Sequence, residues 1–179
     1  MNNPKSANAG AGVPVVPADV FVGLGANLGE PMVTLAACRA RLGAIGYTEL
    51  VAWSGLYRTA PVGFSDQPDF LNAVCHLRTG LEPVALVGIL LDIERDLGRV
   101  RTADRNGPRV IDIDLLFYEG VSMEAAHLHL PHPRLHERGF VLHPWAELSP
   151  DLVIPGHGSI RALRDGTLDQ RVERLPITW

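Results

Sequence analysis

The chain has 179 residues, a length typical of one domain with a single core. A hydrophobic fraction of 46% is enough to fill that core, and no run of 18 apolar residues occurs, which argues against a membrane-spanning helix. A formal net charge of −4 argues against a protein that holds nucleic acid by its overall field, because such binding needs an excess of positive charge. Any phosphate-binding site must therefore depend on charges close to the phosphate and not on the net charge of the chain.

The cysteine and lysine content excludes two further classes of protein. Cys38 and Cys75 are the only cysteines and form no C-x-x-C motif, so we expect a reducing compartment and no disulfide framework. Lys5 is the only lysine and lies outside any G-x-x-x-x-G-K-[ST] motif. This excludes the phosphate loop of P-loop NTPases.

The amino-terminal residues are expected to lie outside the fold. Residues 1–18 are rich in Asn, Ala, Gly and Pro and show no periodicity, which predicts a disordered leader before a single domain over residues 19–179. This leader lacks the apolar stretch of a secretory signal and the arginines of a mitochondrial presequence. We therefore expect a cytoplasmic protein.

The first regular elements are a strand and a helix. The apolar residues 20–22 predict a short buried strand, and Pro31 is typical of the first turn of a helix, which Gly43 would end. The glycines between these elements do not form the G-x-G-x-x-G fingerprint of a dinucleotide site. Leu28 stands where the third glycine would be.

Two strands follow the first helix. One is expected over residues 49–57, and after a loop rich in Pro, Gly and Asp a second carries alternating apolar side chains over residues 71–77. Because successive side chains of a strand point to opposite faces, Phe70 and Asn72 share the other face of this second strand.

A second helix begins at Pro83 and ends at Gly98. Its main apolar stripe starts at Leu86 and recurs at i+4, i+7 and i+11. On a helical wheel Glu94 lies away from the polar face. We expect its carboxylate to be buried, paired or functional.

The next segment places arginines before two carboxylates. Five arginines occur in the 15 residues 95–109, and a strand is expected over residues 110–117. Its period of two puts Asp112 and Asp114 on one face, with Cα atoms roughly 7 Å apart. An isolated pair of this kind usually faces solvent, but Mg²⁺ between the carboxylates would relieve their repulsion and complete its shell with phosphate. Magnesium beside arginine is what triphosphate chemistry requires.

The order of these elements is β-α-β-β-α-β, which is typical of a ferredoxin-like α+β sandwich with an antiparallel sheet and two helices on one face. Additional carboxyl-terminal elements are expected, namely an edge strand over residues 128–130 and a partly helical segment over residues 134–148. RNA-recognition sandwiches share this order, but no strand here carries their basic and aromatic run.

Histidine spacing offers an alternative chemistry. Four histidines lie within ten residues, and three imidazoles could hold a catalytic zinc: His127, His129, His132 and His136. No H-E-x-x-H motif occurs, and two prolines in this segment interrupt any regular face on which the rings would converge. Metal analysis of the purified protein would detect such a site.

Five strings of residues carry a resemblance to a known family. They are GANLG at 25–29, LYRTAP at 56–61, DQPDFLNA at 66–73, GPRVIDID at 107–114 and PHPRLHERGF at 131–140. In this order they resemble the 6-hydroxymethyl-7,8-dihydropterin pyrophosphokinases of folate biosynthesis, from Phe21 to about Pro155. The resemblance implies transfer of the β,γ-diphosphate of ATP to the pterin hydroxymethyl group, with release of AMP.

The resemblance also implies site residues. Asp112 and Asp114 would bind two Mg²⁺ ions, and Arg99 and Arg109 would act on the phosphates as catalytic residues. The other ATP-binding positions would be Glu94, Arg101, Arg105, His132 and Arg138. The pterin-binding positions would be Thr59, Pro61, Val62, Phe70, Asn72 and Phe140. The two phenylalanine rings would stack on the pterin, and Asn72 would read its amide edge.

The implied partners are ATP and a dihydropterin alcohol, with no nucleic acid and no membrane, and the chain is expected to be a monomer. A catalytically silent nucleotide- or pterin-binding module on the same fold is the alternative, and the intact carboxylates and phosphate arginines favour the enzyme. Some positions depart from the family pattern. Asn106 stands where some members have a lid tryptophan, and Ala26, Leu91 and Pro133 also differ.

Overall fold

The structure is a computed structural model that describes residues 16–63, 66–100, 107–125, 127–177 and 179. Its main sheet is built from β1 (Ala18–Ala26), β2 (Thr48–Trp53), β3 (Tyr57–Thr59), β4 (Phe70–Thr79), β5 (Asp112–Tyr118) and β10 (Val172–Arg174). Two short hairpins are β6 (Met123–Ala125) with β7 (Leu128–Leu130) and β8 (Val153–Ile154) with β9 (Gly158–Ser159). The helices are α1 (Pro31–Leu42), α2 (Pro83–Asp96), the 3-10 turn η1 (Leu135–Glu137), α3 (Gly139–Leu148) and α4 (Ile160–Asp165).

Every pairing in the main sheet is antiparallel, in the order β10-β3-β4-β1-β5, and β2 also pairs with β4. The predicted α+β class is therefore confirmed, and the predicted β-α-β-β-α-β order is observed with its second strand divided into β2 and β3. The predicted edge strand over residues 128–130 and the partly helical segment that follows it are also present.

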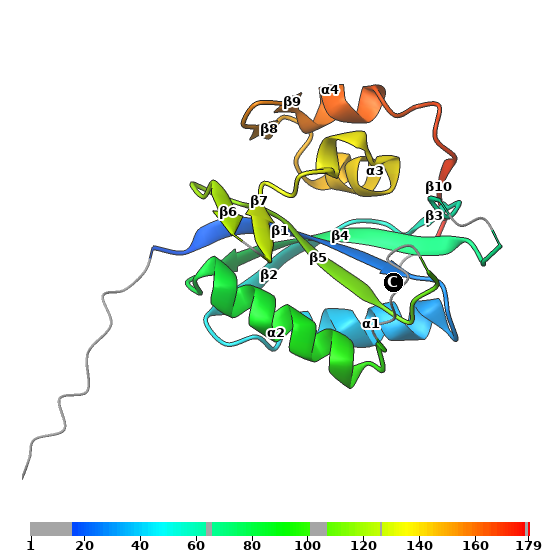
Figure 1. Cartoon of the computed structure of the whole chain (residues 1–179), viewed down its shortest axis with the longest axis horizontal. Helices are drawn as coiled ribbons and strands as arrows, with labels where there is room; N and C mark the ends of the chain where they lie inside the picture. Colours follow the sequence, from blue (N-terminus) through cyan, green and yellow to red (C-terminus); the bar gives the residue numbers. More distant parts are fainter. Residues whose placement is uncertain (1–15, 64–65, 101–106, 126, 178) are drawn as a thin grey trace, which may run out of the picture.

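Helices cover both faces of this sheet (Figure 1). α1 and α2 lie on one face, while α3, α4 and the β8–β9 hairpin lie on the other. Because successive strand side chains point to opposite faces, Leu115 packs in the core beneath α1 and α2, and Leu116 packs in the core with Trp145 of α3. No helix in the described part of the chain has the length and apolar character needed to span a bilayer.

The strand expected over residues 49–57 is wrong as one continuous element. It is interrupted after Trp53, where Ser54 donates its N–H to the Val74 carbonyl and accepts the Val74 N–H on its hydroxyl, at 3.0 Å each. Trp53 pairs with Cys75 and Tyr57 pairs with Asn72, so one extra residue is accommodated on this side of β4. Such an insertion is a bulge, which local periodicity does not reveal.

The predicted leader needs one correction. Ala18 already belongs to β1 and pairs with Thr79, so the sheet begins one residue earlier than expected. Val16 and Pro17 are exposed, and residues 1–15 lie outside the described residues. The strand expected over residues 110–117 is observed two residues later at its start, as β5.

Candidate active site

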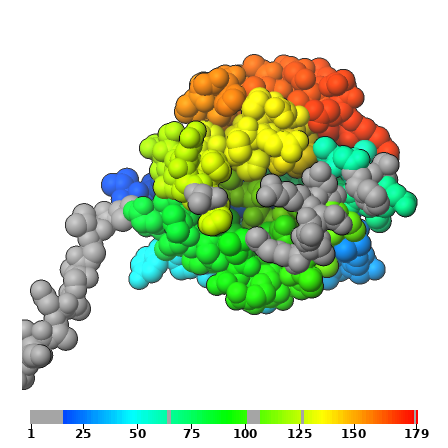
Figure 2. Space-filling view, in the orientation of Figure 1, coloured from blue at the N-terminus to red at the C-terminus, as the bar shows by residue number. Residues whose placement is uncertain are grey.

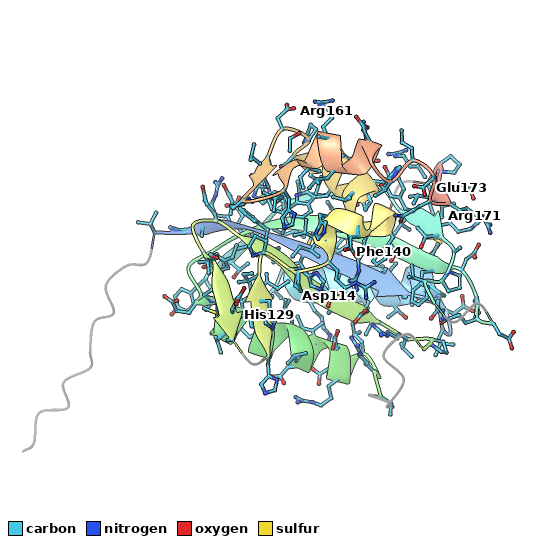
Figure 3. All side chains as sticks on the ribbon, turned by 45° about the horizontal axis from the view of Figure 1, so that its top comes forward. Asp114, His129, Phe140, Arg161, Arg171 and Glu173 are labelled. Carbon is cyan, nitrogen blue, oxygen red and sulfur yellow. The ribbon has the colours of Figure 1, made fainter. Side chains whose placement is uncertain are left out.

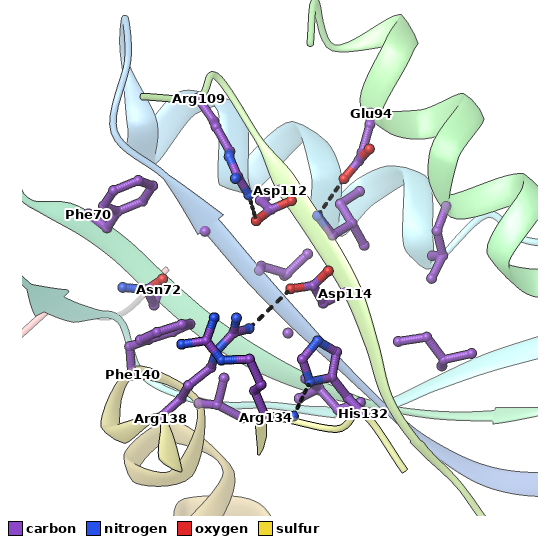
Figure 4. A pocket seen from close by; sticks show the side chains of 18 of the residues that line it. Phe70, Asn72, Glu94, Arg109, Asp112, Asp114, His132, Arg134, Arg138 and Phe140 are labelled. Atoms are coloured by element: carbon purple, nitrogen blue, oxygen red, sulfur yellow. Dashed lines mark hydrogen bonds and ion pairs between the residues drawn. The ribbon is translucent and has the colours of Figure 1, made fainter. Parts of the chain in front are cut away.

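A cleft of about 1110 Å³ opens on the α3 face of the sheet. It is lined by every expected site residue that the structure describes except Pro61, which lines an adjoining pocket of about 320 Å³. Arg101 and Arg105 lie outside the described residues. The cleft therefore brings together residues from several elements, among them β4, α2, β5 and α3 (Figure 4).

The two carboxylates lie on one face of β5, and each is paired with a glycine of β1. Asp112 pairs with Gly25 of β1 and Asp114 pairs with Gly23, so β1 forms an open floor next to both carboxylates. The intervening Ile113 is buried on the opposite face, as the period of two predicts. A side chain at Gly25 would collide with Asn72, because its Cβ would lie 2.9 Å from the Asn72 Oδ1 atom.

Two arginines contact Asp112, and a buried glutamate holds one of them. Arg99 and Arg109 both form ion pairs with its carboxylate, and Arg99 also pairs with Glu94. Glu94 is 2% exposed and accepts the backbone N–H of Ile113 at 2.7 Å. The expectation that Glu94 is buried and paired is confirmed. Glu94 joins α2 to the strand that carries the carboxylates.

Asp114 has a different environment from Asp112. Its carboxylate lies 3.9 Å from the Arg138 guanidinium, and its side chain is 42% exposed. The cleft walls enclose the Asp114 carboxylate although water reaches part of it, and this desolvation, followed by the negative charge of Asp112, raises the pKa of Asp114 above its ordinary value. A cation shared by the two carboxylates would remove the repulsion between them.

His132 lies beside this carboxylate pair as a neutral imidazole. Burial, followed by the positive charge of Arg138, lowers the pKa of His132 to about 4. Its Nδ1 atom accepts the backbone N–H of Arg134 at 3.2 Å. A neutral ring that accepts at Nδ1 carries its proton on Nε2, so His132 offers one donor.

The carboxylate pair fits Mg²⁺ better than zinc. Mg²⁺ is held by one or two carboxylates together with water and substrate phosphates, whereas zinc needs three or four side chains. No group of three or more His, Cys, Asp or Glu suited to a metal occurs among the described residues. His136, one of the four clustered histidines, instead stacks on His157, with ring centroids 4.2 Å apart.

Aromatic and amide side chains form the other end of the cleft. Phe70 and Asn72 lie on β4, and Phe140 on α3 faces them across the cleft (Figure 4). Asn72 is 4% exposed and donates one amide hydrogen to the Thr59 hydroxyl at 2.8 Å. The guanidinium of Arg138 lies 5.5 Å from the Phe140 ring centroid, which connects this end to the carboxylates. Val62 lies at the cleft edge and is 55% exposed.

Sequence reasoning gave no role to Asn27, whose side chain links two parts of the site. It is 4% exposed, and its amide donates to Gln67 Oε1 and the Pro68 carbonyl, both at 3.0 Å. Its Oδ1 atom accepts the backbone N–H of Arg109 at 2.7 Å. The family string GANLG contains Asn27 and could have marked it as a site residue. Its hydrogen-bond partners could not be predicted, because they lie 40 to 82 residues away in the sequence.

Comparison with known proteins identifies the family. Residues 21–150 match the model of the 7,8-dihydro-6-hydroxymethylpterin-pyrophosphokinase (HPPK) family. The chain belongs to this family. The 2-amino-4-hydroxy-6-hydroxymethyldihydropteridine pyrophosphokinase of Methylorubrum extorquens is 48% identical over 143 residues, covering 80% of this chain and 90% of that protein. The enzyme of the same name from Pseudomonas aeruginosa is 40% identical over 157 residues, covering 88% and 96%.

The resemblance predicted from the sequence is thus confirmed. The chain is a pyrophosphokinase of folate biosynthesis, with ATP and a pterin as its substrates. The silent-module alternative is not favoured, because the relatives that match most of this chain are named as enzymes.

Solved structures support the fold. Plasmodium falciparum HPPK-DHPS solved with pteroate superposes with a TM-score of 0.67 at 14% identity, covering 86% of this chain and 43% of that chain. Another P. falciparum HPPK-DHPS chain, solved with STZ-DHP, gives 0.66 at 13% identity, covering 86% and 46%. This chain therefore spans less than half the length of those solved chains.

Proposed function

We propose that this pyrophosphokinase moves the β,γ-diphosphate of ATP to the hydroxymethyl oxygen of 6-hydroxymethyl-7,8-dihydropterin. The hydroxymethyl oxygen forms a bond to the β-phosphorus, the bond from that phosphorus to the α,β-bridging oxygen breaks, and the bridging oxygen leaves with AMP. The hydroxyl proton is released to solvent. One observation carries the proposal: a single cleft has carboxylates and arginines at one end and aromatic rings with an amide at the other.

At the phosphate end, Asp112 and Asp114 would hold two Mg²⁺ ions. These ions would neutralise charge on the phosphate oxygens and orient them for in-line transfer. Arg99 and Arg109 already contact Asp112, so their guanidinium groups lie within reach of phosphates held beside that carboxylate. Each can form paired hydrogen bonds with phosphate oxygens as negative charge shifts toward the leaving AMP.

Around the nucleotide, two further side chains would act as donors. The Nε2–H of neutral His132 can donate to ATP without adding charge, and Arg138 adds a cation beside Asp114. Glu94 supports ATP binding by holding Arg99. Arg101 and Arg105 are proposed as further ATP contacts on the family resemblance alone.

At the pterin end, Phe70 and Phe140 would stack on the two faces of the flat heterocycle. Asn72 donates one amide hydrogen to Thr59, and the same amide has a second hydrogen and a carbonyl oxygen for the pterin edge. Thr59, Pro61 and Val62 would contact the remaining edge. Positioning and charge neutralisation are sufficient for such a transfer without a dedicated general base.

We also propose that the enzyme acts as a monomer in the cytoplasm. Cys38 and Cys75 support a reducing compartment, because both are free thiols buried in the core beneath α1 and α2. Analytical ultracentrifugation of the full chain tests the monomer, since a concentration-dependent dimer mass would contradict it.

Phosphorus NMR tests the proposed transfer. ATP, Mg²⁺ and the pterin alcohol incubated with the enzyme should yield AMP and a pterin diphosphate. Formation of ADP would instead show transfer of a single phosphoryl group and would contradict the proposal. Removal of Mg²⁺ with a chelator should abolish the reaction. Addition of excess Mg²⁺ should restore it.

A further inference from the structure

We infer that Gln170 is a positioning residue for the pterin end of the cleft. It lies outside residues 21–150, which match the family model, and the resemblance assigns it no role. This inference rests on the proposed placement of the pterin between Phe70 and Phe140. It concerns the backbone that carries Phe140 and Arg138.

Helix α3 lacks a capping side chain of its own. Its N-cap residue, Arg138, makes no side-chain hydrogen bond to the first turn. The first N–H groups of a helix have no partner within the helix, so an outside acceptor stabilises the position of its first turn. Gln170 supplies that acceptor, because its Oε1 atom accepts the N–H of Gly139 at 2.8 Å.

The same amide also holds the residue on the other side of Arg138. Its Nε2 atom donates to the Glu137 carbonyl at 2.8 Å, so one side chain binds the backbone both before and after Arg138. Gln170 is 31 residues from Gly139 and 33 from Glu137 in the sequence, which makes these contacts tertiary. They fix where α3 begins relative to the sheet.

Two cleft residues depend on that starting point. Phe140 is the second residue of α3, and its ring position is set by the backbone because the side chain has only two torsions. Arg138 reaches Asp114 at 3.9 Å and the Phe140 ring at 5.5 Å. A shift of this turn would therefore move one wall of the pterin site and the cation beside the carboxylates together.

The neighbouring residues leave little room for such a shift. A Cβ at Gly139 would lie 2.9 Å from Gln170 Oε1 and 3.1 Å from Val172 Cγ2. Val172 is anchored in turn by β10, which pairs it with Thr59 of β3. Arg171, which Figure 3 labels, pairs with Asp69 at 3.1 Å, and Asp69 directly precedes Phe70 in the sequence. Residues 170–172 thus touch the chain beside three expected pterin residues.

The space-filling view shows where the carboxyl-terminal segment meets the strands beside the cleft. The red carboxyl-terminal segment runs down from α4 and meets the turquoise residues around β3 (Figure 2). This segment also lines the pocket of about 320 Å³ that shares Thr59 and Phe140 with the cleft. The pterin end is therefore completed by residues far from the family motifs in sequence.

The test measures binding by calorimetry on the full chain. The pterin alcohol is titrated in the presence of Mg²⁺ and a saturating non-hydrolysable ATP analogue, and the analogue is titrated separately. Gln170→Ala should weaken pterin binding roughly 5- to 30-fold, the range that one to two neutral hydrogen bonds give. Analogue binding should weaken less, by about fivefold or below, because Arg138 on the same turn is only one of several proposed ATP contacts. Gln170→Met retains length and packing but no hydrogen bonds, so it should be impaired similarly.

Two controls make the result decisive. Asp169→Ala changes the adjacent exposed residue of the same segment and should bind both ligands like the parent protein. Phe140→Ala tests the underlying site: normal pterin binding by this variant would contradict the proposed pterin placement itself.

With Phe140→Ala impaired, three outcomes would overturn the role of Gln170 alone. They are parent-like pterin binding by Gln170→Ala, restored binding by Gln170→Met, and equal losses for pterin and nucleotide. Equal losses would indicate general destabilisation, which a thermal melt of each variant detects independently.

Discussion

Asp112 and Asp114 are the same residue type on one strand face, but their surroundings differ. Two arginines neutralise Asp112, whereas Asp114 is 3.9 Å from one arginine and has a raised pKa. The pair therefore combines a carboxylate that holds the two arginines proposed to bind phosphate with a carboxylate that would ionise more readily beside a bound cation. Both properties follow from position on the strand and from the neighbours of each carboxylate.

Neutralising either carboxylate should abolish turnover while leaving the fold intact. Asp112→Asn and Asp114→Asn should each lower kcat by about a thousandfold or more, because an amide is a poor Mg²⁺ ligand. Initial rates of AMP formation and far-UV circular dichroism measure the two properties. Asp92→Asn, which changes an exposed carboxylate paired with Arg95 on α2, is the matched control and should keep its activity. Turnover near the parent value in either active-site variant would remove the metal-ligand assignment.

Asn72 gives a prediction specific to the pterin. Asn72→Leu is close in size but cannot pair with the pterin edge, and an unpaired buried polar group costs about 1–3 kcal/mol. Pterin binding should weaken roughly 10- to 100-fold while nucleotide affinity stays nearly unchanged. Calorimetric titration of each ligand measures this split, with Phe70→Tyr as a variant that retains stacking and should be tolerated. If Asn72→Leu lost nucleotide affinity and kept its pterin affinity, the pterin would have to bind elsewhere.

At the scale of the helices and strands, the sequence predicts features that depend on local periodicity and misses those that depend on contacts between elements. Period two on β5 placed Asp112 and Asp114 correctly, and the helical wheel of α2 singled out Glu94, because both depend on local geometry. The bulge at Ser54 was missed since it depends on a hydrogen bond to Val74 in another strand. The contacts of Gln170 were missed for the same reason: side-chain partners far apart in sequence leave no periodic signal.

Asn27 is the element-scale connection whose loss should affect both substrates. It joins the loop after β1 to the loop before β4 and to Arg109. Asn27→Ala therefore removes three hydrogen bonds between segments that carry the proposed pterin and phosphate contacts. We expect kcat to fall about 10- to 100-fold, with a rise in KM for the pterin, because each buried bond contributes roughly 1 kcal/mol. Steady-state kinetics measure both parameters.

A matched control for Asn27 is Thr34→Ala, which removes an exposed hydrogen bond to Glu30 in the first turn of α1. Its kinetics should match those of the parent protein. An Asn27→Ala enzyme with lower thermal stability but parent kcat would show that the connection supports the fold without positioning the site.

At the scale of the whole molecule, one carboxylate of α3 adds three hydrogen bonds to the apolar packing between the α3 layer and the sheet. Glu147 of α3 accepts the Gly55 N–H at 2.7 Å, the Tyr57 hydroxyl at 2.6 Å and the Arg174 guanidinium. These donors belong to the interruption between β2 and β3, to β3 and to β10. Glu147 thus connects the layer that carries Phe140 to the strands that carry Thr59 and Val172.

This attachment should depend on pH. Burial alone would raise the pKa of Glu147, but hydrogen bonds from Tyr57, Gly55 and Arg174 outweigh it and hold the pKa below its ordinary value. A carboxyl whose pKa is lower in the folded state adds stability above its unfolded pKa, about 4.3 for glutamate, and loses it as the pH falls through the folded value. The contribution is therefore full at pH 7 and declines in acid.

Glu147→Gln should lower the free energy of unfolding by about 1 kcal/mol at pH 7, a modest value because the side chain is 26% exposed. The difference from the parent should shrink toward zero as the pH falls below about 4, where the parent carboxyl also becomes neutral. Urea denaturation at a series of pH values measures it. Glu173→Gln, which changes an exposed carboxylate paired with Arg58, should show little difference at any pH. A Glu147→Gln deficit that is equally large at pH 7 and pH 3 would mean that the shape of the side chain, and not its charge, attaches the α3 layer.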